Sequence, residues 1–206
     1  MSRWPWPRVA DRVTSASGTS GLPGDSAVRA PMRKSRHWRS VAIALVLAVS
    51  AATLRLFIWP DQGMPARVSA IVMLNGTGDR LTTALDLAWQ HRAPFVVISR
   101  GSQAFGHGGD CAPSIPHVTV ICFDPNPSTT KGEAEFVGRL ARKYHWQSVA
   151  LVTITSQDSR ARLRVERCFA GPVYVVTVPL PLSAWPYEIA YEWAATIKAD
   201  IFQRIC

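Results

Sequence analysis

The sequence predicts an α/β fold, a Rossmann-like three-layer sandwich with about five mainly parallel strands, preceded by one transmembrane helix. Two observations lead to this prediction. From residue 68 onward, short apolar runs alternate with segments of helical spacing, an order typical of a parallel sheet with helices on both faces. Before them stands one continuous apolar run, residues 41–59, in a chain of 206 residues that has room for about one ordinary domain plus such extensions.

Residues 1–39 are predicted to form a disordered basic tail, because they are rich in Ser, Gly, Pro and Arg and lack apolar periodicity. The true start of the chain is either Met1 or Met32, since Met32 opens a compact basic segment of its own. Residues 1–40 hold eight Lys or Arg and two Asp, so most of the net charge of +9 precedes the apolar run. There it indicates a cytoplasmic N-terminus, and no nucleic-acid partner is expected.

Residues 40–59 are predicted to cross the lipid bilayer once. The run 41–59 contains one charge, Arg55, and spans roughly 28 Å as a helix. Two alternatives stay open: a cleaved signal peptide, with small residues at 48–51, and a buried helix of a soluble core. The anchor is favoured because the run is longer than a usual signal-peptide core and apolar on every face. It places the C-terminal domain of the chain outside the cell membrane, after a stalk at 60–67.

The domain, residues 68–206, begins with a strand. Residues 68–74 form an apolar run that ends in the turn sequence Asn-Gly-Thr-Gly, typical of a buried strand. A helix is expected over 80–92, where Leu and Ala recur at helical spacing on one face. Pro94 then precedes the β-branched strand 95–99.

The second half of the domain repeats this alternation. A glycine-rich loop, 101–116, leads into strand 118–123, and Ser128 or Thr129 caps a helix that runs to about residue 145. The remaining elements follow from the same apolar patterns: strand 148–153, a helix over 156–169, strand 173–178, and, after a Pro-rich loop, a final helix from Pro186.

Four segments that follow strands are expected to meet at one rim of the sheet, because ligands of open α/β sheets bind beyond the carboxyl ends of the strands. These segments are 75–80, 99–101, 124–133 and 153–160.

The first rim segment, Asn-Gly-Thr-Gly-Asp-Arg, predicts an anion site. Its glycines, Gly76 and Gly78, let backbone N–H groups approach an anion, and the following helix N-terminus attracts it. Arg80 and Arg160 are predicted to clamp a phosphate or carboxylate. Only Arg160 is expected to reach the rim from its helix, so Arg162, Arg164 and Arg167 are expected to be solvated. The alternative is a plain tight turn between strand and helix.

Glu133, in the first turns of a predicted helix, is the acid–base candidate. The alternative role for this side chain is a carboxylate that complements the helix dipole. No metal-binding spacing of His or Cys occurs, and no G-x-S-x-G elbow. A disulfide among Cys111, Cys122 and Cys168 is expected in an oxidising space, although Cys122 also suits a buried strand position.

Together, these segments resemble the YdcF-like domain family, which includes the SanA and ElyC envelope proteins. The resemblance covers residues 68–202 and implies an envelope protein that binds a nucleotide-like, S-adenosylmethionine-like or other anionic ligand. Many members carry a membrane anchor before the domain. The matching residues are Ala70–Gly76 with Arg80 and Ala84, then Ala93–Gly101, Pro127–Ala134, Val152-Thr153, Arg160-Ala161, Tyr191-Glu192 and Lys198.

One position departs from the family pattern. The family usually has a His three residues before the Arg of the fourth segment, and this chain has Gln157 there. Gln can hydrogen-bond a ligand but cannot shuttle a proton at neutral pH. His107 and His117, which flank the glycine-rich loop, are the candidates to substitute for it.

The sequence therefore predicts a membrane-anchored envelope protein whose domain binds a small anion at the carboxyl rim, with hydrolase or transferase activity through Glu133. The expected partner is a phosphate- or nucleotide-like ligand or an anionic intermediate of the cell envelope. The alternative is a non-catalytic ligand- or partner-binding factor of envelope biogenesis, as Gln157 indicates. No cofactor or metal is assigned. The candidate ligand-binding residues are Asn75, Gly76, Gly78, Arg80, Ser99, Ser128, Thr129, Gln157 and Arg160.

Overall fold

The computed structural model describes residues 34–100 and 114–206. The first helix, α1 (Lys34–Thr53), continues into a wider helical turn, η1 (Leu54–Ile58). Residues 34–39 are therefore helical, where the sequence predicted a disordered tail. Lys and Arg are good helix formers, so the polar flank extends the apolar helix.

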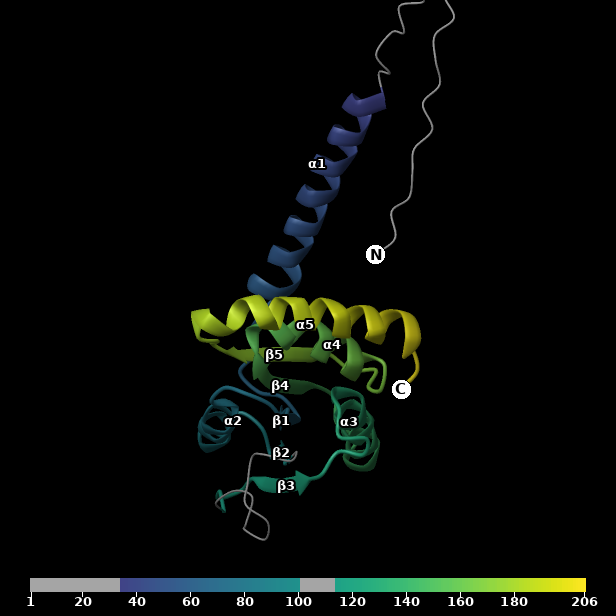
Figure 1. Ribbon diagram of the computed structural model, residues 1–206. Coiled ribbons are helices and arrows are strands. Elements are labelled where there is room, and N and C mark those ends of the chain that lie inside the picture. Colours follow the sequence, from purple (N-terminus) through teal and green to yellow (C-terminus); the bar gives the residue numbers. More distant parts are fainter. Residues whose placement is uncertain (1–33, 101–113) are drawn as a thin grey trace, which may run out of the picture. The chain divides into compact units, whose positions relative to one another are not determined.

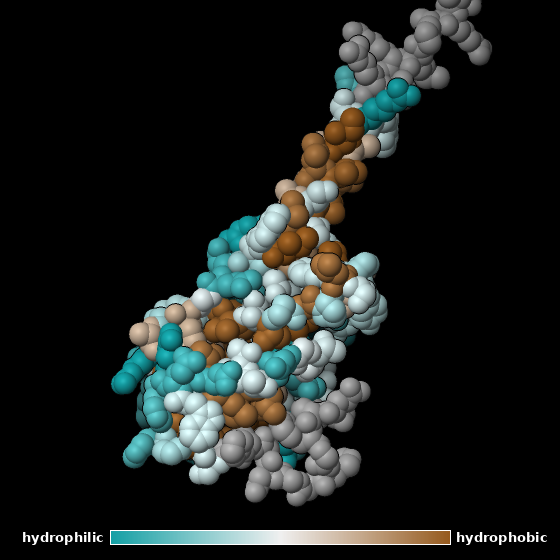
Figure 2. Space-filling view, turned by 90° about the vertical axis from the view of Figure 1, so that its left-hand side faces the viewer, coloured by the Kyte–Doolittle hydropathy of each residue, from teal (hydrophilic) through white to brown (hydrophobic). Residues whose placement is uncertain are grey.

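One span, His37–Ile58, is long and apolar enough to cross a membrane by its length and composition. Almost none of it is buried. Figure 2 shows its hydrophobic side chains gathered along α1. Such exposure disfavours the alternative of a buried core helix, since a core helix covers its apolar face with protein.

The sheet has five strands in the order β3-β2-β1-β4-β5, and every neighbouring pair is parallel. This confirms the predicted α/β class. The strand order changes direction between β1 and β4. From β1 the chain adds β2 and β3 on one side of the sheet, and it then returns to add β4 and β5 on the other side. Such a switch point opens a crevice at the carboxyl ends of the two central strands. The strands are β1 (Ala70–Met73), β2 (Phe95–Ser99), β3 (Thr119–Phe123), β4 (Val149–Ile154) and β5 (Val173–Val178).

Helices cover both faces of this sheet, as Figure 1 shows for α2 and α3. Apolar residues of α2 pack with one set of strand side chains, and those of α3 and α4 pack with the alternate set. Successive strand residues point to opposite faces, so each strand contributes to both cores. The helices are α2 (Arg80–Trp89), α3 (Thr130–Tyr144), α4 (Asp158–Glu166) and α5 (Trp185–Ile197).

The element boundaries differ from the sequence prediction by a few residues. Thr129, not Ser128, caps α3, because its side chain accepts a hydrogen bond from the Gly132 N–H. A 3₁₀ turn, Thr155–Gln157, precedes α4. Gln157 thus lies in a turn before the helix rather than inside it.

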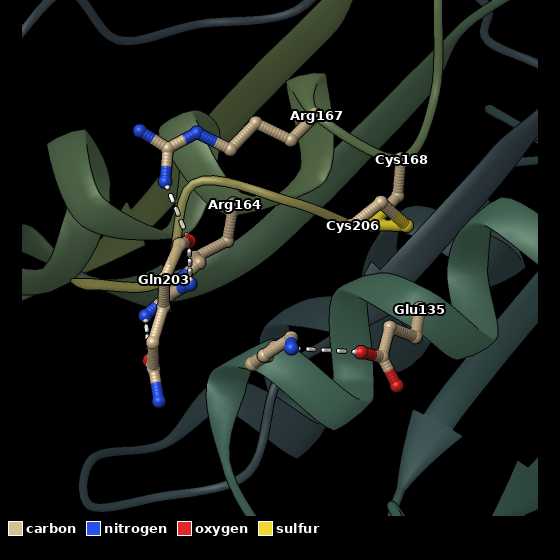
Figure 3. Close-up of a disulfide and its surroundings, with 7 residues drawn as sticks. Glu135, Arg164, Arg167, Cys168, Gln203 and Cys206 are labelled. Atoms are coloured by element: carbon tan, nitrogen blue, oxygen red, sulfur yellow. Dashed lines mark hydrogen bonds and ion pairs between the residues drawn. A yellow bond between two sulfur atoms is a disulfide. The ribbon is translucent and has the colours of Figure 1, made fainter. Parts of the chain in front are cut away.

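A disulfide between Cys168 and Cys206, shown in Figure 3, joins the C-terminus to the turn that follows α4. The expected set of partners (Cys111, Cys122 and Cys168) is therefore wrong for Cys168. The two cysteines are 38 residues apart, and only the return of the chain end to α4 brings them together. Cys122 is also disulfide-bonded, and Cys111 lies outside the described residues.

Arg164 and Arg167 point toward this returning segment (Figure 3). Arg164 donates to the Gln203 carbonyl oxygen at 2.8 Å, and Arg167 donates to the same oxygen at 2.9 Å. Arg162 donates to the Val173 carbonyl oxygen at 2.7 Å. The prediction that these three arginines are solvated is wrong, because each donates to a backbone carbonyl oxygen that lies outside α4.

Candidate functional site

A pocket of about 460 Å³ lies at the carboxyl rim of the sheet. The loop after β1, the N-terminus of α3, the turn before α4, and α5 surround it. The structure brings most of the predicted site residues to this one place, and their role in binding stays a prediction. The predicted residues that line it are Asn75, Gly76, Arg80, Ser128, Thr129, Glu133, Gln157 and Arg160.

Two predicted residues lie outside the pocket lining. Gly78 has φ +90° and packs against the sheet, where a Cβ would lie 3.0 Å from Val178 Cγ2. Ser99 ends β2 and is fully buried. His117, a candidate substitute for the missing histidine, is exposed and does not line the pocket either. His107 lies outside the described residues.

Arg80 folds back under the loop that precedes it. Its Nε donates to the Thr77 carbonyl oxygen at 2.8 Å, and its Nη1 donates to the carbonyl oxygens of Leu74 (3.1 Å) and Asn75 (2.8 Å). Burial lowers the pKa of Arg80 to about 10. Among the described residues, none accepts a hydrogen bond from its Nη2, so this end of the guanidinium is left for the pocket.

Gly76 is the position that lets Arg80 adopt this arrangement. Its φ is +141°, and a Cβ there would lie 2.6 Å from Arg80 Nη2. Gly76 of the rim segment therefore permits the close approach of an arginine in this structure.

Glu133 reaches from α3 to the end of β1. Its Oε1 accepts a hydrogen bond from the Asn75 N–H at 2.7 Å, so the side chain connects two rim segments instead of capping its own helix. Burial raises its pKa, against the opposing effects of the Ser99 hydroxyl, the Asn75 N–H, Arg80 and Arg160. The Ser99 hydroxyl itself has no hydrogen-bond partner among the described residues. A buried carboxyl with a raised pKa is suited to proton transfer.

Thr130 is the centre of a polar network that the sequence did not single out. Its hydroxyl oxygen accepts from Gln157 Nε2 at 3.2 Å and from Arg160 Nη1 at 2.9 Å. Gln157 Oε1 in turn accepts from the Thr153 hydroxyl at 2.8 Å. A hydroxyl that accepts two bonds still has one hydrogen to donate, and no described residue accepts it.

Arg160 has a partner that sequence reasoning missed. Its guanidinium makes two hydrogen bonds to the Glu192 carboxylate, at 2.7 and 2.8 Å, and the Glu192 side chain is only 1% exposed. Tyr191 lies beside the pair, with its ring 5.7 Å from Arg160 Cζ. The family resemblance in the last helix, which includes Tyr191-Glu192, was the one signal for this contact. Two of the five N–H donors of Arg160 keep no protein acceptor among the described residues.

The pocket lining is more positive than negative. Three glutamates and five basic side chains contribute to it, and the N-terminus of α3 adds its partial positive charge. In the described part of the chain, no group of three His, Cys, Asp or Glu could hold a metal ion. The charged lining residues are Arg80, Lys131, Arg160, Arg164, Lys198, Glu133, Glu188 and Glu192.

No protein-family model matches this chain, and no curated protein matches it. Among solved structures, two of pantothenate synthetase from Thermus thermophilus are similar at 18% and 16% sequence identity. Each match covers 68% of this chain and 71% of the synthetase chain, and the TM-scores are 0.30 and 0.31. Scores this low support no conclusion about function, and the fold rests on the chain's own strand order.

Proposed function

We propose that this chain is a membrane-anchored, outward-facing, YdcF-like protein of the cell envelope that binds a small anionic ligand in the rim pocket. The ligand class is phosphate- or nucleotide-like. α1 is the anchor, with the N-terminus on the cytoplasmic side, as its basic flank favours.

One observation carries the proposal: hydrogen-bond donors without protein acceptors converge on the pocket. Among the described residues, Thr130 keeps one O–H, Arg160 keeps two N–H groups, and Arg80 keeps its Nη2. All three residues line the same pocket. A ligand with several acceptor oxygens and a negative charge satisfies these donors, and charge-assisted hydrogen bonds are the strong ones.

The test replaces the Arg160–Glu192 pair by two methionines, R160M/E192M, in the full chain. The net charge stays the same, and a buried ion pair can be replaced by apolar side chains with little loss of stability. Inorganic pyrophosphate and AMP are the probes, titrated by calorimetry. We expect affinity to fall by at least about tenfold, because one charged donor is worth roughly 1.5–3 kcal/mol.

The matched control is R162M/D158M, which removes a second Arg–carboxylate pair from the same helix. Neither Arg162 nor Asp158 lines the pocket. Equal affinity of the native chain and R160M/E192M for both probes would sink the proposal, as would an equal loss in the control.

Glu133 supports a catalytic form of the proposal, in which it acts as the base of a hydrolase or transferase. Gln157 supports the alternative, a non-catalytic ligand- or partner-binding factor, because both ends of its amide are hydrogen-bonded and it cannot carry a proton. A phosphoester screen separates the two forms. Turnover that disappears in Glu133→Gln supports the enzyme, and turnover gained only in Gln157→His supports a binder.

A further inference from the structure

An exposed apolar stripe runs along α5 and its continuation η4 (Lys198–Phe202). The large members are well exposed: Tyr187 by 71%, Tyr191 by 48%, Ile197 by 47% and Ile201 by 56%. Together with Ala190 and Ala194 they recur at intervals of one, three and four residues, which places all six on one side of the helix. An apolar face of this length that the described residues leave uncovered indicates an interaction surface. The apolar stripe consists of Tyr187, Ala190, Tyr191, Ala194, Ile197 and Ile201.

One flank of α5 contacts the end of the apolar helix. The Trp193 indole N–H donates to Thr53 Oγ1 at 3.0 Å, and its ring meets Phe57 edge-on at 5.4 Å. Phe57 is fully buried, and the Ser159 hydroxyl donates to the Leu56 carbonyl oxygen at 2.7 Å. The last turn of the candidate span is therefore packed into the domain, which keeps α5 next to the place where the span ends.

The other flank of the stripe reaches the pocket. Tyr187 and Tyr191 belong to both the stripe and the pocket lining, and Lys198 lines the pocket one residue after Ile197. Helix α5, which carries the stripe, thus contacts the end of the apolar helix through Trp193 and lines the pocket through Tyr187 and Tyr191.

We infer that the apolar stripe lies in the headgroup layer of the same bilayer that α1 enters, so that α5 is an interfacial helix and the pocket opens at the membrane surface. Tyrosines suit this layer because the ring is apolar and the hydroxyl stays wet, and Trp59, 69% exposed just after the span, suits it as well. Interfacial helices insert to about 5–10 Å, the depth of an aromatic side chain. The inference rests on the proposed anchoring by α1.

The experiment uses the full chain in vesicles of phosphatidylcholine and phosphatidylglycerol. An environment-sensitive fluorophore is attached to one new cysteine at a time, and the described cysteines are disulfide-bonded and do not compete. Ala194→Cys reports on the stripe, Thr82→Cys on an exposed polar site of α2, and Val46→Cys on the candidate span. Each label is exposed to nitroxide-bearing lipids and, separately, to aqueous iodide.

We expect the label at Ala194 to be quenched several-fold more by lipid nitroxide than the label at Thr82, and several-fold less by iodide. Strong iodide quenching at Ala194 with lipid quenching at Val46 overturns the interfacial helix and leaves the anchor standing. Iodide quenching at Val46 overturns the anchor itself. Protection of Ala194 from both quenchers, with an intermolecular disulfide through the unlabelled Ala194→Cys, assigns the stripe to a second copy and overturns the inference.

Discussion

The buried Arg160–Glu192 pair gives the sharpest test of how α5 is held on the domain. The single change Glu192→Ala leaves the Arg160 guanidinium charged, with its side chain only 10% exposed and two hydrogen bonds lost. Removing one partner of a buried pair costs about 3–5 kcal/mol, because the remaining charge is desolvated without compensation. For a domain of this size, that lowers Tm by about 6–20 °C.

The comparison with R160M/E192M separates this penalty from the net value of the pair. The double variant removes both charges and fills the space with apolar side chains, so its stability should lie within about 1–2 kcal/mol of the native chain. Thermal unfolding followed by near-ultraviolet circular dichroism measures both variants in the same detergent. A double variant as unstable as Glu192→Ala would refute the reasoning, because packing and not charge would then carry the cost.

Three further predictions concern stability. Cys206→Ser removes only the Cys168–Cys206 bond and should lower the free energy of unfolding by about 4 kcal/mol, since it opens a loop of 38 residues; an unchanged denaturant titration would contradict this. Burial raises the pKa of Asp158 from 3.8 to about 6, so the folded chain holds a proton here that the unfolded chain loses at lower pH. The stability that this proton adds is fully present well below pH 3.8 and is lost as the pH rises through 6, about 3 kcal/mol in all. Asp158→Asn should abolish that slope, and an unchanged slope would assign it to other groups. Gly132→Ala should cost about 1–3 kcal/mol, because a Cβ would lie 2.0 Å from the Pro127 carbonyl oxygen, and an unaltered chemical denaturation midpoint would contradict this.

The fold was predictable because its signals are local. Apolar strands of four to six residues and helices with one apolar face follow from spacing alone, and the observed strands start and end within two residues of expectation. The Thr129 cap is of the same kind, since it depends on residues three positions apart. The rim site was partly predictable because parallel strands end at one edge, whatever the details of packing.

The pairings within the site were not predictable from such signals. Arg160 and Glu192 are 32 residues apart, and nothing in the spacing of either indicates the other. The same holds for Cys168 with Cys206 and for Arg164 with Gln203. Arg160 was expected to hold a ligand, Cys168 to pair with Cys111 or Cys122, and Arg164 to be solvated. The actual partners were missed because contacts between residues more than 30 positions apart are long-range features.

The sequence by itself determined the α/β class, the five parallel strands, the apolar helix before them and the rim at which polar residues gather. The tertiary structure alone decided which donors of that rim are already satisfied and which still face the pocket. The physical reason is range: helix and strand periodicity is set by neighbours within four residues, whereas a buried charge takes whichever partner the folded chain brings to it, and here that partner is on α5.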